Sequence, residues 1–441
     1  MYRRFSTIAV VLGSLLASLA VSDFASGATR NARPRARKRP PPSAPTSQDL
    51  FRRYRDRVFQ VRIVDKASSA QSSLGTGFFV SPDGLAVTNY HVVSELVLNP
   101  TQYRAELVRE GAPPVPIAIL DLDVVQDLAL LKAETGTAYF EFQPDAPPKG
   151  TRLFSLGNPH DLGLSIVEGS YNGIVAESFY EKIHFTGAIN SGMSGGPTIG
   201  ADGRVVGVNV ASSGNQIGFL VPASYAKRLL DQATSRDAAT AEALMERVRT
   251  SLVESQDRVT TRLLESFSKT LELGPYVVPG DVDPALHCWG DTDRSKGQAY
   301  EEVSRYCASD DEIYLTGNHR TGLVWTYKQW FSTKDLNPVA FYKLYERAFN
   351  SIDTKIRAGR EDVTPFRCRD GRVRSGDIDF ETVFCARAYR RVAGLYDVLF
   401  AAASVDSSKN GLQTTLTLGG FSFENAREIA RRYLEAVKWK N

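Results

Sequence analysis

The chain has 441 residues, of which 53 are Lys or Arg and 50 are Asp or Glu, so its formal net charge is only +3. This near balance gives no indication of nucleic-acid binding, which usually requires a large basic excess. Composition therefore argues against one class of function and leaves the others open.

The amino terminus has the pattern of a secretory signal peptide. Two arginines precede an apolar run from Ile8 to Val21, which is too short for a membrane span. Small residues at Ser26 and Ala28 offer a cleavage site, as does a second pair inside the run. We interpret residues 1–28 as a cleaved signal peptide, with an uncleaved anchor as the alternative. No cysteine follows the run, so we expect no lipid anchor there.

Residues 29–48 form a basic and proline-rich segment. Such a composition cannot bury a core, so we expect an extended tether. Its cationic side chains could also contact anionic lipid head groups or polyanions. A solvated linker explains the composition better, and we take that interpretation.

The first motif with chemical content is a histidine at the end of a strand-like segment. Residues 77–80 and 84–89 are rich in β-branched and aromatic side chains, and the turn Ser81-Pro82-Asp83-Gly84 separates them. His91 follows the second segment, so we expect it on the rim of a barrel. The other four histidines lack this setting: His160, His184, His287 and His319.

A carboxylate is predicted at the edge of the same core. Asp127 directly precedes Leu128-Ala129-Leu130-Leu131, an apolar run of strand length. An ordinary surface aspartate is the alternative, and Asp121 and Asp123 lie close enough in the chain to compete for the role.

A glycine-rich stretch supplies a serine: Asn190-Ser191-Gly192-Met193-Ser194-Gly195-Gly196-Pro197. Its glycines permit a tight backbone in which the amides of Gly192 and Ser194 point at a developing oxyanion. A serine hydroxyl becomes a nucleophile when an imidazole takes its proton and a carboxylate orients the imidazole. Ser194, His91 and Asp127 offer one residue for each role, although a Gly-x-Ser-Gly-Gly string also occurs in ordinary turns.

These motifs resemble those of trypsin-like serine proteases of the chymotrypsin fold, most closely the bacterial HtrA or Do-like branch. Further stretches follow the family's order: Gly75-Thr76-Gly77-Phe78, Ser155-Leu156-Gly157-Asn158-Pro159, Gly173-Ile174-Val175, Ala188-Ile189-Asn190, Gly207-Val208-Asn209 and Gly218-Phe219-Leu220-Val221-Pro222. The likeness covers residues 59–222, about two fifths of the chain. It implies a two-barrel protease domain over residues 49–222.

The resemblance implies a role for each motif residue. Ser194 would attack the scissile carbonyl, His91 would act as general base and then general acid, and Asp127 would orient His91. The backbone amides of Gly192 and Ser194 would form the oxyanion hole. The implied function is an exported serine endopeptidase that forms an acyl-enzyme and needs no cofactor or metal. A protease-like binding or chaperone protein with little turnover is the alternative, but the intact triad favours catalysis.

The resemblance also bears on activation and specificity. Met193 stands where the digestive branch has aspartate and the HtrA branch usually has asparagine. Because methionine cannot pair with a new amino terminus, we expect no activation by such an ion pair. Ala188 would form a small, neutral pocket floor that favours small or aliphatic side chains, with loose selectivity. Asn209, Val210 and Ala211 would form the strand on which substrate lies as an added β-strand.

All four cysteines lie in the second half of the chain: Cys288, Cys307, Cys368 and Cys385. We expect two disulfides, in agreement with an exported protein. Sequential pairing closes the shortest loops, but four cysteines allow three connectivities and the sequence does not choose among them. Zinc is a weaker alternative, because no Cys-x-x-Cys is present and His287 is the only nearby imidazole.

The pattern changes after the protease segment, and residues 223–273 predict a helical connector. Apolar residues recur there at spacings of about four or seven: Leu244, Val248, Leu252, Val259, Leu263, Phe267 and Leu271. Gly274-Pro275 is expected to end this amphipathic helix. Without sustained heptads, we expect the helix to pack on its own chain rather than to form a coiled coil.

The remainder of the chain is long enough to bury a separate core, and it resembles no family that we recognise. Residues 312–315 and 323–327 flank the turn Gly317-Asn318-His319-Arg320 and predict a hairpin. Residues 341–349 and 425–434 predict helices.

We therefore predict a β domain followed by a disulfide-containing α+β domain at residues 274–441. Gly419-Gly420-Phe421 is similar to the carboxylate-binding loop of PDZ domains, but a strand-ending turn explains it better, so no PDZ domain is recognised. The role of this domain is open between substrate selection and regulation. As partners we expect protein or peptide substrates, no nucleic acid and no stable membrane span after signal cleavage. A homo-oligomer stays open because many relatives are trimers or larger.

Overall fold

The computed structural model describes most of the chain from residue 44 onwards. The described ranges are 44–134, 138–212, 217–233, 237–281, 283–293, 299–350 and 353–440. The predicted signal peptide, and most of the predicted linker, lie outside them. The chain divides into two units, and the second, Pro45–Asn441, contains every element described below. No helix within the described ranges has both the length and the apolar composition needed to cross a membrane.

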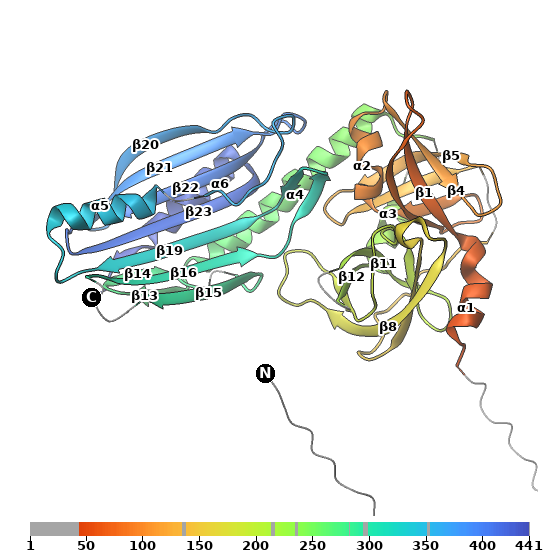
Figure 1. The fold of residues 1–441 in the computed structure, drawn as a ribbon, viewed down its shortest axis with the longest axis horizontal. Helices are drawn as coiled ribbons and strands as arrows, with labels where there is room; N and C mark the ends of the chain where they lie inside the picture. The colour runs from red at the N-terminus through yellow and green to blue at the C-terminus, as the bar shows by residue number, and fades with distance from the viewer. Residues whose placement is uncertain are drawn as a thin grey trace, which may run out of the picture. The chain divides into compact units, whose positions relative to one another are not determined.

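Six antiparallel strands close into a first barrel (Figure 1). They are β1 (Val58–Asp65), β2 (Gln71–Phe79), β3 (Leu85–Thr88), β4 (Tyr103–Val108), β5 (Val115–Asp123) and β6 (Leu128–Ala133), in the spatial order β1-β2-β3-β6-β5-β4. Helix α1 (Ser47–Tyr54) precedes β1, and α2 (Tyr90–Leu98) lies between β3 and β4. Alternate side chains of the strands face the core, as Ile117 and Ile119 of β5 do.

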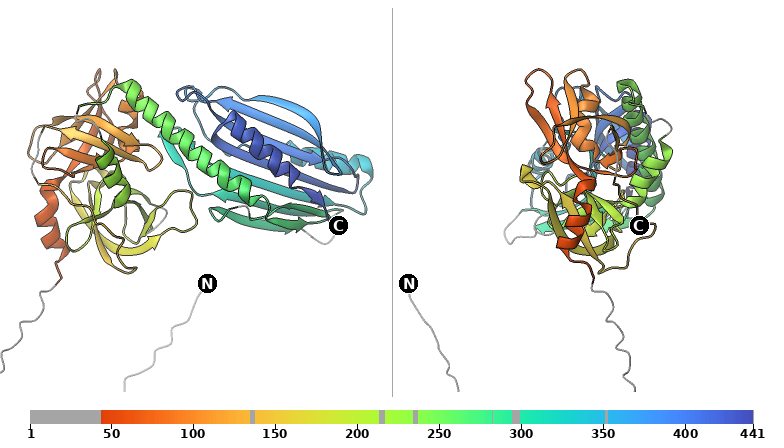
Figure 2. Two further views of the ribbon diagram at one scale, coloured as in Figure 1. Left: turned by 180° about the vertical axis from the view of Figure 1, so that it is seen from behind. Right: turned by 90° about the vertical axis from the view of Figure 1, so that its right-hand side faces the viewer.

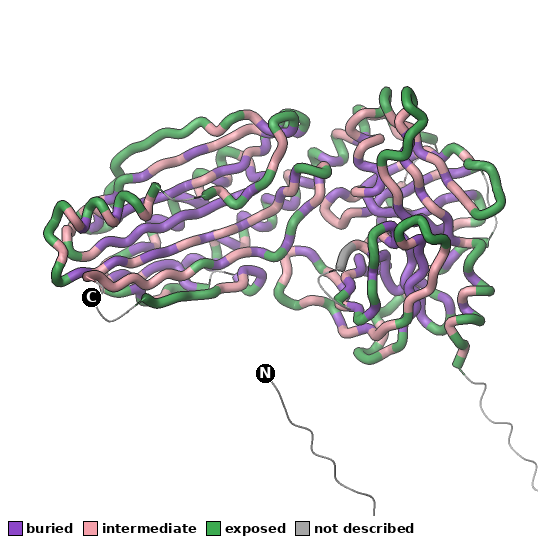
Figure 3. Tube along the Cα trace, viewed as in Figure 1, coloured by how far each residue is buried: buried purple, intermediate pink, exposed green. Residues whose placement is uncertain are grey.

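A second six-stranded barrel follows. Its strands are β7 (Arg152–Gly157), β8 (Ser165–Ile174), β9 (Ile183–Phe185), β10 (Pro197–Ile199), β11 (Val205–Ser212) and β12 (Gly218–Pro222), in the order β10-β11-β12-β9-β8-β7. Buried residues run along the strands of both barrels (Figure 3). The two closed barrels confirm the predicted two-barrel architecture.

Helix α4 (Ala241–Ser266) follows the short α3 (Ala223–Gln232) and joins the barrels to the rest of the chain (Figure 2). Leu244, Val248 and Leu252 of α4 are buried in the core of the first barrel, whereas Val259 and Leu263 are buried in the core of the carboxy-terminal sheet. One apolar face of the helix therefore belongs to two cores, and the helix packs on its own chain as predicted.

The predicted end of this helix is wrong. Leu271 lies in β13 (Thr270–Leu273), which pairs with β14 (Tyr276–Pro279). The chain leaves the helix after Ser266, whose carbonyl accepts a hydrogen bond from the Lys269 amide. Gly274, with a φ of +60°, makes the hairpin turn between these strands instead of stopping the helix. The four-residue spacing from Phe267 to Leu271 is therefore a coincidence, because the chain passes from helix to strand between these two residues.

The carboxy-terminal domain is built on a seven-stranded antiparallel sheet. Its strands, in spatial order, are β15 (Leu286–Asp293), β16 (Glu301–Ser309), β19 (Val324–Ser332), β23 (Asn410–Ser422), β22 (Leu395–Ser404), β21 (Ile378–Ala388) and β20 (Arg367–Ser375). Helices α4 and α6 (Phe423–Glu435) cover one face, and α5 (Pro338–Phe349) lies on the other (Figures 1 and 2). A small sheet adds β24 (Lys438–Trp439) to β13 and β14. The predicted helices and the predicted α+β class are confirmed.

The predicted hairpin is correct in its turn but wrong in its second strand. Strand β17 (Ile313–Thr316) pairs with the three-residue β18 (His319–Thr321), not with residues 323–327. Gly322, with a φ of +85°, redirects the chain after β18, and β19 then enters the large sheet between β16 and β23. Gly419-Gly420-Phe421 lies inside β23 of the same sheet, so it is part of a long strand rather than a strand-ending turn.

The structure decides the disulfide pairing that the sequence left open. Cys288 bonds Cys307 across β15 and β16, and Cys368 bonds Cys385 across β20 and β21. Each pair occupies directly opposite positions, with Cα atoms 4.0 Å and 3.9 Å apart. Asp281 has an oxygen within 4.8 Å of the Cys288 and Cys307 sulfurs. Because these sulfurs bond each other, neither is a thiolate, and the zinc alternative loses its ligands at this place.

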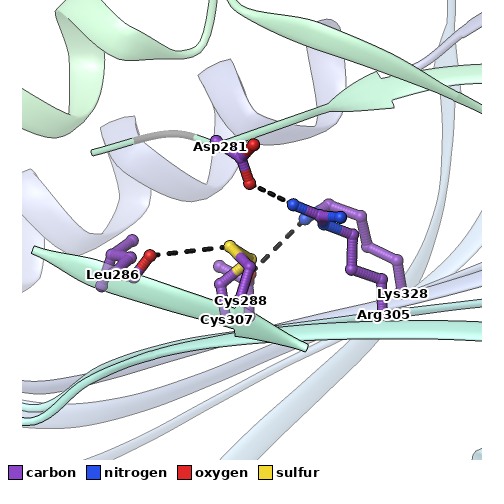
Figure 4. Close-up of a disulfide and its surroundings, with 7 residues drawn as sticks. Asp281, Leu286, Cys288, Arg305, Cys307 and Lys328 are labelled. Atoms are coloured by element: carbon purple, nitrogen blue, oxygen red, sulfur yellow. Dashed lines mark hydrogen bonds and ion pairs between the residues drawn. A yellow bond between two sulfur atoms is a disulfide. The ribbon is translucent and has the colours of Figure 1, made fainter. Parts of the chain in front are cut away.

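A lysine lies buried beside the first disulfide (Figure 4). Lys328 of β19 has no exposed surface, donates to Thr326 Oγ1 at 3.4 Å and lies 5.6 Å from the ring centre of Tyr433. Its cross-strand neighbour Arg305 forms an ion pair with Asp281. Burial, assisted by the charge of Arg305, lowers the pKa of Lys328 from 10.5 to about 7.

This pKa makes the stability of the sheet depend on pH. Between pH 7 and 10.5 Lys328 is protonated in the unfolded chain but neutral in the folded chain. Lowering the pH through this range therefore stabilises the unfolded chain and reduces the free energy of unfolding. We expect Lys328→Met to raise the free energy of unfolding at pH 7 by about 2–4 kcal/mol, because a pKa difference of one corresponds to about 1.4 kcal/mol. The gain should shrink as the pH approaches 10.

Urea titrations at pH 7 and pH 10, monitored by tryptophan fluorescence, measure the unfolding of the carboxy-terminal domain, which contains Lys328. All four tryptophans lie there: Trp289, Trp325, Trp330 and Trp439. Lys438→Met, at an exposed lysine, is the matched control and should leave stability nearly unchanged. A Lys328→Met gain that is the same at both pH values would contradict a neutral buried amine.

Candidate active site

Two paired strands bring the predicted histidine and carboxylate together. His91 is the second residue of α2, directly after β3, and Asp127 directly precedes β6. Strands β3 and β6 pair side by side, with Thr88 opposite Ala129, so the residues beyond these ends become neighbours. His91 Nδ1 lies 2.6 Å from Asp127 Oδ2, and the His91 amide donates to Asp127 Oδ1 at 2.8 Å. The imidazole is therefore held through its Nδ1 atom, which leaves Nε2 for a substrate-side proton.

The backbone of Asp127 is constrained as strongly as its side chain. Its φ of +53° lies in the left-handed region, where residues other than glycine are uncommon. Its carbonyl accepts from the Tyr90 amide at 3.1 Å and from Asn89 Nδ2 at 2.7 Å. These contacts, together with the two from His91, compensate for the unfavourable conformation.

The two competing aspartates have other partners. Asp121 forms an ion pair with Arg247 at 3.3 Å, and Asp123 accepts a hydrogen bond from the Gln126 amide at 3.0 Å. Burial raises the pKa of the Asp123 carboxyl. Neither carboxylate forms a hydrogen bond with His91 in the described part of the chain, so Asp127 alone is placed to orient the imidazole.

The loop that carries Ser194 requires its glycines. Gly192 and Gly195 have φ values of +91° and +83°. A Cβ atom on Gly192 would lie 2.3 Å from the Asn158 carbonyl oxygen, and one on Gly195 would lie 2.2 Å from the Thr76 carbonyl oxygen. Thr76 also binds the loop directly, because its amide donates to the Ser194 carbonyl and its hydroxyl to the Gly192 carbonyl. Strand β2 thus fixes the loop against the first barrel.

Two amides of this loop are free to bind an oxyanion. The Ser191 carbonyl accepts from the His160 amide at 2.9 Å, so the N–H of Gly192, on the other side of the same trans peptide, points the opposite way. The amides of Met193, Gly195 and Gly196 all donate to backbone carbonyls. The amides of Gly192 and Ser194 have no acceptor among the described residues. This is the pair that the sequence predicted for an oxyanion hole.

In this resting structure the Ser194 hydroxyl does not donate to the imidazole. Ser194 Oγ donates instead to the Val210 carbonyl at 3.2 Å. The hydroxyl therefore has to leave the Val210 carbonyl before it can donate to another acceptor. Catalytic hydrogen bonds of this kind commonly tighten only when substrate is bound.

Met193 anchors the loop from inside the second barrel. Its side chain has no exposed surface and packs in a core cluster with Ile189 and Phe185. A Cβ atom on Gly157 would lie 2.8 Å from the Met193 Cα, which shows how closely strand β7 approaches. The side chain at this position therefore holds the loop by apolar packing.

Asn209 lies in a different environment from the one predicted for a substrate strand. It has no exposed surface, and its side chain accepts from Ser155 Oγ and Thr198 Oγ1 and donates to the Leu156 and Met193 carbonyls. Its backbone amide and carbonyl bond Gly196 and Gly195. Asn209 therefore holds the nucleophile loop onto the barrel. Apart from the family pattern around Asn209, nothing in the sequence indicated this role.

The other predicted specificity residues are less constrained. Val210 contributes the carbonyl that binds Ser194, and the backbone of Ala211 pairs with Phe219. Ala188 is exposed in the segment between β9 and β10. The side chain of Ala211 lies outside what the structure describes.

Comparison with known proteins agrees with this geometry. Residues 75–208 match the family described as a trypsin-like peptidase domain. The chain contains a trypsin-like peptidase domain. The matched range includes the three residues predicted to form the triad, His91, Asp127 and Ser194.

Curated relatives also match part of the chain. A probable periplasmic serine endoprotease, DegP-like, from Chlamydia pneumoniae is 34% identical over 180 residues, which are 38% of this chain and 36% of the relative. A protein of the same description from Rhizobium meliloti (strain 1021) is 32% identical over 209 residues, 43% of this chain and 38% of the relative. The chain thus spans little more than a third of the length of these relatives.

Solved structures also align with part of the chain. A serine endoprotease from Yersinia pestis aligns with a TM-score of 0.38 and 23% identity, over 43% of this chain and 66% of that one. A protease from M. tuberculosis in its active form aligns with the same TM-score and 19% identity, over 44% of this chain and 87% of that one.

The requirement for glycine at residue 192 can be tested against a matched position of the peptidase domain. Gly150 has a similar φ of +88°, but a Cβ atom there would meet nothing within 4 Å. An alanine at either position pays about 1–2 kcal/mol for the left-handed conformation. Only Gly192→Ala also clashes with Asn158 and must displace the amide predicted to line the oxyanion hole.

We expect Gly192→Ala to slow the reaction of Ser194 with a fluorophosphonate by about 10²–10³-fold, the typical effect of losing one oxyanion donor. Gly150→Ala should react within about twofold of the unmodified protein, because a Cβ atom there meets nothing within 4 Å and displaces no neighbour. Thermal unfolding of both variants controls for stability. Equal reaction rates for the two variants would show that the Gly192 amide is not used.

Proposed function

We propose that the protein is an exported serine endopeptidase that hydrolyses protein substrates through an acyl-enzyme on Ser194. The observation that carries the proposal is the 2.6 Å contact of His91 Nδ1 with Asp127, beside a serine flanked by two free amides. The peptidase-domain match and the relatives named serine endoproteases support it.

The geometry gives each group one task. Ser194 Oγ leaves the Val210 carbonyl and donates to His91 Nε2, which takes the proton as Oγ attacks the substrate carbonyl. The oxyanion forms between the Gly192 and Ser194 amides. Asp127 accepts a hydrogen bond from Nδ1–H and stays ionised, so that it stabilises the imidazolium, which then protonates the leaving amine. Water repeats these steps on the acyl-enzyme, so this chemistry requires no cofactor or metal.

We further propose that cleavage follows small or aliphatic residues. Ala188 offers no charge to pair with a basic side chain, and an apolar pocket discriminates a methylene by only about 1–3 kcal/mol. Main-chain bonds to the strand around Val210 and Ala211 would supply much of the affinity. Because Met193 is anchored in the core, the oxyanion loop needs no ion pair with a new amino terminus.

The proposed compartment is the periplasm or the extracellular space. The relatives named above are described as periplasmic. Two disulfides in one domain fit an oxidising environment. The predicted signal peptide at residues 1–28 provides the route of export.

Substitution of the nucleophile tests the proposal. We expect the purified protein to degrade casein and to react with a fluorophosphonate, and Ser194→Ala to lose both activities. Ser165→Ala, at a serine of β8 whose hydroxyl donates to the Gly163 carbonyl at 3.4 Å and to no other described residue, is the matched control and should keep both. Labelling that survives Ser194→Ala would refute the nucleophile assignment.

A second variant tests the orienting carboxylate. Asp127→Asn should keep the fold, since asparagine tolerates a positive φ, but should lower kcat by about 10⁴-fold because the imidazole is then held in the wrong tautomer. Asp123→Asn makes the same change at a neighbouring buried carboxylate that does not contact His91, and it should leave kcat within about twofold. A similar kcat for both variants would show that Asp127 does not orient the base.

A binding protein or chaperone with little turnover is the second candidate. The Ser194 hydroxyl bound to Val210 rather than to His91 favours it, because a lapsed or gated site would show this arrangement. That candidate predicts binding of unfolded casein without cleavage and without fluorophosphonate labelling of the unmodified protein.

A further inference from the structure

The β17–β18 hairpin belongs to the carboxy-terminal domain but packs beside the catalytic histidine. Ile313 and Leu315 of β17 are 4% and 5% exposed and lie in the apolar core cluster of the first barrel. The hydroxyl of Tyr90, the residue before His91, donates to the Leu315 carbonyl at 3.3 Å. The hairpin is therefore attached to the helix that carries the proposed general base.

Asp311, just before the hairpin, attaches it to the second barrel as well. This residue is 4% exposed, and its carboxylate accepts from Ser178 Oγ at 2.8 Å and from the Phe179 amide at 2.5 Å. Lys182 completes the arrangement with an ion pair at 3.0 Å. A carboxylate with several charged and neutral donors is held in one position. The base of the hairpin is thus fixed to the segment between β8 and β9.

Tyr314 lies between the two buried residues of β17 and meets the active site. Its ring centre lies 5.6 Å from that of His91, with the ring planes inclined by 53°. Arg320, directly opposite in β18, places its guanidinium 4.0 Å from the Tyr314 ring centre and donates to the Thr316 carbonyl at 2.8 Å. The Tyr314 hydroxyl has no hydrogen bond to any described residue. The aromatic ring of Tyr314, rather than its hydroxyl, therefore makes the contacts with the His91 imidazole and the Arg320 guanidinium.

A cavity of about 320 Å³ lies between the hairpin and the barrels. Its walls include His91, Asp127 and Val210 of the peptidase domain and Ile313, Tyr314 and Arg320 of the hairpin. The Val210 carbonyl also holds the Ser194 hydroxyl, so the cavity opens beside the triad, along the strand proposed to bind substrate. The side chain of a bound peptide that lies over His91 would enter it.

We propose that Tyr314 is a specificity-determining residue, whose ring closes the subsite over His91 and limits the substrate side chain there to a compact one. The inference rests on the proposed protease function and names part of its substrate class. Val124, Val125 and Phe219 give the cavity an apolar part, and Glu181, Lys182 and Glu312 give it a charged part. The Tyr314 ring fills space between them, so its removal would enlarge the space available to a substrate side chain. The carboxy-terminal domain thereby selects substrate at the active site itself.

Cleavage profiles on a mixed peptide library test this role. Tyr314→Phe keeps the ring and should keep the profile of the unmodified protein. Tyr314→Ala should raise kcat/KM for peptides with a large aromatic residue at this subsite by about tenfold or more relative to peptides with a small one. Tyr342→Ala, the same change at a 41% exposed tyrosine of α5, should leave the profile unchanged.

The controls separate the failure of this inference from failure of the proposed function. Fluorophosphonate labelling of every variant reports an intact Ser194, and tryptophan fluorescence reports a folded carboxy-terminal domain. If the unmodified protein neither labels nor cleaves, the proposed function is wrong. If it cleaves and Tyr314→Ala, folded and labelled, keeps the same profile or gains equally on all peptides, Tyr314 does not determine specificity.

Discussion

The short contact between His91 and Asp127 is the constraint on which the rest of the site depends. It exists because β3 and β6 are neighbours in a closed barrel, so that a helix start and a strand start meet at one rim. The left-handed backbone of Asp127 would be unfavourable alone, but four hydrogen bonds to it compensate. The catalytic geometry is therefore a property of the whole barrel rather than of a local motif.

The two halves of the protein share buried structure around this site. Helix α4 contributes to the core of the first barrel with one end and to the core of the large sheet with the other. The β17–β18 hairpin adds its own apolar residues to the first core, and Asp311 binds the second barrel. A domain that no sequence pattern connected with catalysis is thus built into the walls around His91.

The sequence predicted the elements whose patterns are local. Within a few residues, the sequence indicates the tight loop around Ser194, the turn before β3 and the strand after Asp127. The order of these motifs along the chain predicted the two barrels. The sequence could not predict that Leu271 leaves the helix, because its spacing fits both a helix and a strand. Nor could it show that Asn209 is buried or that Tyr314 meets His91, since these contacts join residues far apart in the chain.

The two disulfides lie at opposite margins of the large sheet, one across β15 and β16 and the other across β20 and β21. Each joins directly opposite residues, so neither outer strand can slip by one position, a shift that would turn every side chain to the other face. The edge strands of a sheet have unpaired backbone groups, through which another chain can pair with the sheet. A reductant would therefore loosen these margins first, while the cysteine-free barrels would keep their covalent structure unchanged.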